Sequence, residues 1–254
     1  MIFLLIRILP YIIPLIYLSL LKVIFYFPNY WIWIILIVVS LSLLWFILLK
    51  NRDKSKFLLP SLIYALIFII TGFAYLVILE NNWVIISFSI CWSFILWLYL
   101  EAVFHDFYKT EKTYILNLQN ISLYSNILVI FFLSASLLNF VIFLNWSKTL
   151  VLFFLLLIYF CLLYSMFLFQ GWEIKKAQIF SFILALIMIE FFASIVLLPL
   201  SFYVAASLSA GLYYFLSSIS ILWIKQNLNK IAFIKYLSFF LIFTGVIVGS
   251  AIWR

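Results

Sequence analysis

The chain is divided into nine long apolar stretches, and this pattern constrains its fold more than any other feature. The stretches cover residues 2–27, 31–49, 57–79, 83–104, 121–144, 149–170, 178–200, 202–224 and 235–253. About 20 apolar residues in a helix, at about 1.5 Å each, cross the hydrocarbon core of a bilayer, which is about 30 Å thick. The sequence therefore predicts an all-α bundle of about nine transmembrane helices, forming a single integral membrane domain over residues 1–254.

The composition agrees with this class. Hydrophobic residues make up 70% of the chain and charged residues only 9%, whereas ordinary soluble domains have about 45–50% and about 25%. The sequence has no Gly-rich phosphate loop and no G-x-S-x-G nucleophile motif, which excludes two common kinds of enzyme. The first stretch contains Arg7 and lacks a small-residue cleavage site, so we expect a retained helix rather than a signal peptide.

The net charge of +8 is explained by the position of the basic residues. Four joints between the apolar stretches contain Lys50, Arg52, Lys54, Lys56, Lys109, Lys112, Lys175, Lys176, Lys225, Lys230 and Lys235. The other four joints, which alternate with these, are short and contain few basic residues. The positive-inside rule therefore predicts a multi-pass protein of the cell (cytoplasmic) membrane, with its N-terminus inside and its C-terminus outside. Membrane lipids are expected partners of the basic face, and nucleic acid is not.

Glu190 lies near the middle of the stretch 178–200, where an ionisable group costs roughly 2.5 to 3.5 kcal/mol. At a similar depth on the next stretch are Tyr213 and Tyr214, and Asn139 is a further possible partner. These four residues are the predicted intramembrane polar site. Glu190 is then either a proton-binding group of a transporter or a protonated carboxyl that locks helices together.

A second polar group, Glu101, His105 and Asp106, follows near the predicted cytoplasmic end of the fourth stretch. Glu101 and His105 are four residues apart and so share one face of a helix. Such a pair could serve as an acid and a base acting on a lipid headgroup, or it could be a solvated helix end. His105 is the only histidine, and metal centres usually need several ligands, so neither a metal nor another cofactor is expected.

Gly245 and Gly249 are four residues apart in the last apolar stretch. Small residues at this spacing let another helix approach closely. The sequence therefore predicts a helix-packing face, and its partner could belong to the same chain, to another membrane protein or to a homo-oligomer.

Several short motifs resemble an uncharacterised family of multi-pass membrane proteins from small-genome bacteria of the candidate phyla. They are Asn117-Leu-Gln-Asn-Ile-Ser-Leu-Tyr124, Phe143-Leu-Asn-Trp146, Ile189-Glu190-Phe-Phe, Leu198-Pro199 and Trp253-Arg254. The resemblance covers roughly residues 57–254. It implies a bacterial inner membrane and a place for Glu190 in a shared pattern, and the family has no assigned activity to carry over.

Three functions follow as hypotheses. The first is a non-enzymatic accessory or scaffold protein that packs with membrane partners. The second is a proton-linked small-molecule transporter that uses Glu190. The third is a membrane-embedded lipid-modifying enzyme that uses Glu101, His105 and Asp106.

Overall fold

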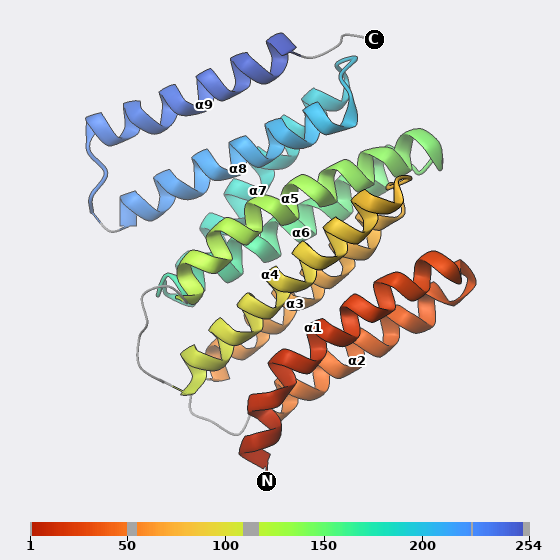
Figure 1. The fold of residues 1–254 in the computed structure, drawn as a ribbon. Helices are drawn as coiled ribbons and strands as arrows, with labels where there is room; N and C mark the ends of the chain where they lie inside the picture. Colours follow the sequence, from red (N-terminus) through yellow and green to blue (C-terminus); the bar gives the residue numbers. More distant parts are fainter. Residues whose placement is uncertain (1, 50–54, 109–116, 225, 251–254) are drawn as a thin grey trace. The chain divides into compact units, whose positions relative to one another are not determined.

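The computed structural model describes residues 2–49, 55–108, 117–224 and 226–250, and these form nine α-helices (Figure 1). The helices are α1 (Ile2–Tyr26), α2 (Trp31–Leu49), α3 (Ser55–Leu76), α4 (Asn82–Tyr108), α5 (Leu118–Phe143), α6 (Lys148–Phe169), α7 (Ile174–Val196), α8 (Phe202–Ile224) and α9 (Lys230–Ser250). A short 3-10 turn, η1 (Pro28–Tyr30), joins α1 to α2. All nine are long and apolar enough to cross a membrane. Within the described residues, this confirms the predicted all-α class and number of spans.

Several helices extend beyond the apolar stretches that predict them. α4 continues to Tyr108 rather than ending near residue 104, and α9 begins at Lys230 rather than near residue 235. α7 begins at Ile174 and so includes Lys175 and Lys176, which the apolar pattern places in a joint. Backbone hydrogen bonding can continue past the hydrocarbon boundary, because an α-helix satisfies its own backbone groups in lipid and in water alike. Hydropathy thus marks the part of a helix in lipid and not the end of its hydrogen bonding.

The chain divides into two compact units, residues 1–125 and residues 126–254. Unit 1 contains α1 to α4 and the start of α5, and unit 2 contains the rest of α5 and α6 to α9. We describe each unit by itself, and the expectation of a single membrane domain stays a prediction.

In unit 1, Tyr17 of α1 and Trp92 of α4 meet α3 at Gly72. Tyr17 Oη donates to the carbonyl oxygen of Ile69 at 3.1 Å, and Trp92 Nε1 donates to that of Phe68 at 3.2 Å. A Cβ atom at position 72 would overlap both the tyrosine hydroxyl and the indole nitrogen. The absence of a side chain at Gly72 therefore permits this contact of three helices.

α1 contains two prolines, and the first leaves a backbone carbonyl of α1 free to bond to α2. Pro10 has no N–H, so the carbonyl of Ile6, four residues earlier, lacks its usual donor within the helix. Trp45 of α2 is fully buried, and its Nε1 donates to that carbonyl at 3.1 Å. The side chain of Trp45 thus supplies the hydrogen bond that Pro10 removes.

Unit 2 is held by polar groups buried between α5, α6 and α8. The fully buried Asn126 donates through Nδ2 to Tyr213 Oη at 2.6 Å and to the carbonyl of Leu162 at 3.4 Å. Tyr213 Oη in turn donates to Met166 Sδ at 3.3 Å. In a membrane, such bonds between helices help to fix the packing where hydrophobicity alone does not select it.

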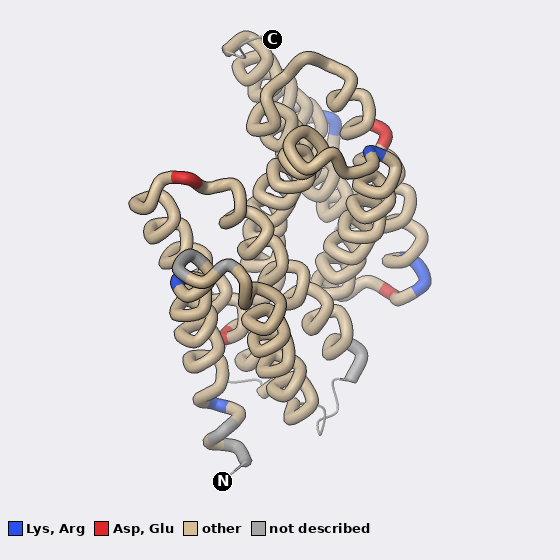
Figure 2. The backbone as a smooth tube through the Cα atoms, turned by 90° about the vertical axis from the view of Figure 1, so that its right-hand side faces the viewer, with Lys and Arg blue, Asp and Glu red and all other residues tan. Residues whose placement is uncertain are grey.

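Charged residues are few along the described helices (Figure 2), and Glu173, Lys175 and Lys176 lie close together at the start of α7. Part of the predicted basic face lies outside the described residues, namely Lys50, Arg52, Lys54, Lys109, Lys112 and Lys225, and so does Arg254 at the predicted external end. Trp253 lies outside them too. The orientation in the membrane stays a prediction from the sequence.

Candidate functional site

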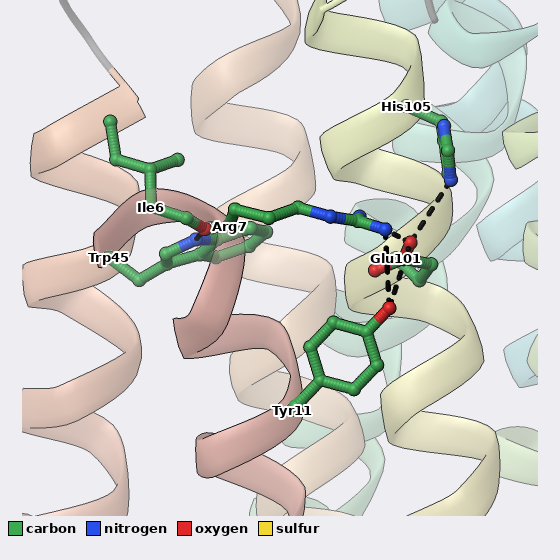
Figure 3. A network of polar contacts seen from close by, with 6 residues as sticks. All are labelled: Ile6, Arg7, Tyr11, Trp45, Glu101 and His105. Atoms are coloured by element: carbon green, nitrogen blue, oxygen red, sulfur yellow. Dashed lines mark hydrogen bonds and ion pairs between the residues drawn. The ribbon is translucent and has the colours of Figure 1, made fainter. Parts of the chain in front are cut away.

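The most connected ionisable group of unit 1 is the carboxylate of Glu101 on α4 (Figure 3). Its side chain is almost fully buried, and its Oε1 lies 2.5 Å from Arg7 Nη1 and 3.0 Å from His105 Nε2. Tyr11 Oη donates to the same oxygen at 3.5 Å. Arg7 and Tyr11 are one turn apart on α1, and Glu101 and His105 are one turn apart on α4. One turn of α1 and one turn of α4 thus meet at a single carboxylate oxygen.

The guanidinium of Arg7 makes two further contacts besides its ion pair with Glu101. Its Nη2 donates to Tyr11 Oη at 3.2 Å, and its guanidinium carbon lies 4.8 Å from the ring centroid of Phe104. The face of an aromatic ring attracts a guanidinium, most strongly where water is excluded. These contacts fix the cation beside Glu101 and compensate a charge that would be expensive to bury alone.

The cluster lies near the first residue of α1 and the last residue of α4. α4 has 27 residues and is about 40 Å long, which exceeds the hydrocarbon core by about 10 Å. Glu101 is seven residues before Tyr108, the last residue of α4, or about 10 Å from that end. Arg7 is five residues from the first residue of α1, or about 8 Å. We therefore place the cluster at the boundary between hydrocarbon and headgroups.

Three polar atoms along α4 lack a hydrogen-bond partner in the described part of the chain. They are Ser93 Oγ, Trp97 Nε1 and Glu101 Oε2, and all three are buried. They follow one another at intervals of four residues, so they lie along one side of α4. The indole of Trp97 lies 5.9 Å from the ring of Tyr11 on α1, centroid to centroid. Beside α1, α4 therefore has an unpartnered donor at Trp97 Nε1 and an unpartnered acceptor at Glu101 Oε2.

The structure brings two members of the predicted group of Glu101, His105 and Asp106 into direct contact. The spacing of four residues gives the Glu101–His105 contact, as expected from helical geometry. Asp106, the next residue, is half-buried and is not part of the network in Figure 3. Arg7 and Tyr11 belong to the network although sequence reasoning did not select them. A signal for Arg7 was present in the sequence: Arg7 lies as far from the start of the first span as Glu101 lies, approximately, from the end of the fourth, and these two spans are antiparallel.

Glu190 has a different environment from the one that the sequence suggests. Its side chain is exposed, and Ser194 Oγ bonds to its backbone carbonyl rather than to its carboxyl. The buried positions of α7 include Met188, Phe192 and Ile195, and Glu190 lies on the other side of the helix. It is also six residues before the end of α7, about 9 Å, rather than at its centre.

The expected partners of Glu190 have other contacts in unit 2. Tyr213 is buried with Asn126 and Met166, and the ring of Tyr214 lies 5.6 Å from that of Phe239 of α9, centroid to centroid. Asn139 is half-buried on α5. The described residues therefore do not show Glu190, Tyr213, Tyr214 and Asn139 as one site. The grouping of these four residues stays a prediction from the sequence, and depth, which suggested Tyr213 and Tyr214, does not specify the direction in which a side chain points.

α9 presents its small residues away from α8. Phe243 lies over Gly211 of α8, where a Cβ atom would come within 2.5 Å of its ring. Gly245 and Gly249 are exposed, and a Cβ atom at either would meet nothing within 4 Å. The predicted helix-packing face is thus open in this chain.

No group of three His, Cys, Asp or Glu side chains that could hold a metal ion occurs among the residues that the structure describes. No protein-family model matches the chain, and no curated protein or solved structure is significantly similar to it.

Proposed function

We propose that this multi-pass membrane protein is a non-enzymatic accessory or scaffold protein that binds a membrane partner through α9. The open face of α9 at Gly245 and Gly249 is the observation that carries the proposal. α9 has no buried residue, although it is a 21-residue helix, and it packs chiefly on α8. Two glycines one turn apart let a second helix approach the backbone of α9 closely.

The basic joints favour a cytoplasmic N-terminus and an external C-terminus in the inner membrane of a bacterium. The resemblance to multi-pass proteins of candidate-phyla bacteria supports the same location. With nine spans, α9 would run outward and end at the external surface.

The test uses the open space around the glycines. Changing both Gly245→Leu and Gly249→Leu should leave the melting temperature of the purified chain unchanged, because a Cβ atom at either position meets nothing within 4 Å. The same change should remove the partner that a tagged chain retains when it is purified from native membranes. Ile247→Leu, on the same helix, is the control and should keep the partner. A doubly substituted chain that still retains its partner would contradict the proposal.

The cluster at Glu101 supports a second candidate, action on a lipid headgroup. Glu101 and His105 form an acid–base pair at headgroup depth, and Glu101 Oε2 has no described partner. In that case Glu101→Gln should leave the chain folded but change the lipid composition of the host membrane. A scaffold in which Glu101 only joins α1 to α4 would show a lower melting temperature and normal lipids.

Transport through Glu190 has less support in unit 2. A transport path is usually lined by several polar groups, and the described residues place Glu190 on the exposed side of α7. Tyr213 and Tyr214, which were predicted to share its site, have the separate contacts described above.

A further inference from the structure

Two opposite charges are exposed within spanning helices, Lys22 on α1 and Glu190 on α7. Neither side chain makes a hydrogen bond or an ion pair with another residue that the structure describes. A charge within a spanning helix is expensive to leave in lipid unless it reaches the headgroups or pairs with a charge of opposite sign. A partner of opposite sign would therefore offset this cost for each.

Lys22 and Glu190 lie at similar distances from the last residues of their own helices. Lys22 is four residues before Tyr26, the last residue of α1, and Glu190 is six residues before Val196, the last residue of α7. These intervals are about 6 Å and about 9 Å along the helices. α1 and α7 are both odd-numbered spans, so they cross in the same direction and end at the same membrane face. The difference of about 3 Å is within the reach of a lysine side chain.

The surroundings of the two charges also match. Leu15, Ser19 and Lys22 are exposed on α1 at spacings of four and three residues, so they share one side of that helix. Ser194 follows Glu190 by one turn on the exposed side of α7. Both serine hydroxyls bond to carbonyls of their own helices, at 2.7 and 2.8 Å, which leaves small, internally satisfied residues beside the charges. Small residues at such positions allow two helices to approach closely.

Other lysines in the described helices fit Glu190 less well. Lys235 is exposed on α9, but it is only five residues after the start of an odd-numbered span and so lies near the opposite face. Lys148 is the first residue of α6 and lies at the membrane surface rather than within it. Depth therefore favours Lys22.

We propose that Lys22 of one copy of this chain pairs with Glu190 of a second copy. Copies in one membrane are related by rotation about the membrane normal, and this rotation preserves depth. Residues that meet between copies must therefore lie at similar depths, and the distances of Lys22 and Glu190 from their helix ends agree with this requirement. The proposal concerns a face other than Gly245 and Gly249 and does not depend on the partner of α9.

The experiment co-expresses two full-length chains with different tags and measures how much of one is recovered with the other from mild detergent. Wild-type chains should associate. Lys22→Met and Glu190→Gln should each weaken the association about tenfold, the value expected for a polar contact between membrane helices. Lys148→Met is the matched control, because it removes a lysine near the same face, and it should have no effect.

Charge reversal in separate chains distinguishes pairing between copies from any other role. A chain with Lys22→Glu and a chain with Glu190→Lys should each fail to self-associate, since each carries two like charges. Mixed together, they should recover the wild-type association, because each supplies the charge that the other lacks. The melting temperature of each chain alone shows whether it is folded.

Three results would overturn the proposal: wild-type chains that do not associate, neutral variants that associate like the wild type, or reversed chains that fail to combine. The substitutions at Gly245 and Gly249 should leave self-association unchanged. Loss of the α9 partner and loss of self-association are thus separate results.

Discussion

Replacing Gly72 by alanine is a direct test of how unit 1 is packed. The new methyl group would overlap the hydroxyl of Tyr17 and the indole nitrogen of Trp92. Overpacking of this kind costs about 1–3 kcal/mol. The displaced side chains would also lose their bonds to the carbonyls of Ile69 and Phe68, at about 0.6 kcal/mol each for membrane proteins.

One gain opposes these losses. Alanine is more favourable than glycine inside a helix by up to about 1 kcal/mol. The expected net loss from Gly72→Ala is therefore about 2 kcal/mol. For a chain of this size, that corresponds to a melting temperature lower by about 4–8 °C.

The measurement is thermal unfolding of the full chain in detergent, followed by tryptophan fluorescence. Gly245→Ala is the matched control, because it makes the same change within a helix where a Cβ atom meets nothing within 4 Å. This control should be as stable as the wild type or slightly more stable. Adding Tyr17→Phe to Gly72→Ala removes the overlapping hydroxyl and should recover part of the loss. If Gly72→Ala and Gly245→Ala melted at the same temperature, the described contact of α1, α3 and α4 would be refuted.

Two further predictions concern the orientation and the proline of α1. In a chain without its own cysteines, Asn81→Cys and Ser147→Cys should react with an impermeant thiol reagent from outside the cell, whereas Glu173→Cys and Gln226→Cys should not; the inverse pattern would reverse the orientation. Trp45→Phe should lower the melting temperature, because it leaves the Ile6 carbonyl without a donor, and the loss should be smaller in a Pro10→Ala background, where the backbone supplies an N–H. Equal losses in the two backgrounds would show that Trp45 acts only by filling space.

The spans were predictable from the sequence because the hydrocarbon core imposes a length on each apolar helix. The ends were less predictable: α4 continues to Tyr108 and α9 begins at Lys230, because a helix satisfies its own backbone hydrogen bonds on either side of the hydrocarbon boundary. Hydropathy measures the environment of a segment and gives no direct information on where its hydrogen bonding stops.

The Glu101–His105 contact could also be predicted, since it depends only on positions within one helix. The contribution of Arg7 and Tyr11 depends on which helix lies beside α4. Helices that are apolar on nearly every side do not encode their neighbours in a periodic pattern, unlike the amphipathic helices of soluble proteins. The direction of Glu190 was hidden for the same reason.

The pair of Arg7 and Glu101 differs from the proposed pair of Lys22 and Glu190 in the direction in which the side chains point. Arg7 and Glu101 are matched in depth and face each other within unit 1, where they join α1 to α4. Lys22 and Glu190 each lie within two turns of the last residue of their own helix, and both are exposed. An internal pair stabilises the packing of the chain that contains it, and its loss should appear in the melting temperature. An exposed pair has no such function in a single chain, and its loss should appear only in association. The contrast between Glu101→Gln and Glu190→Gln in these two measurements therefore tests whether burial alone distinguishes a structural charge from a charge that selects a partner.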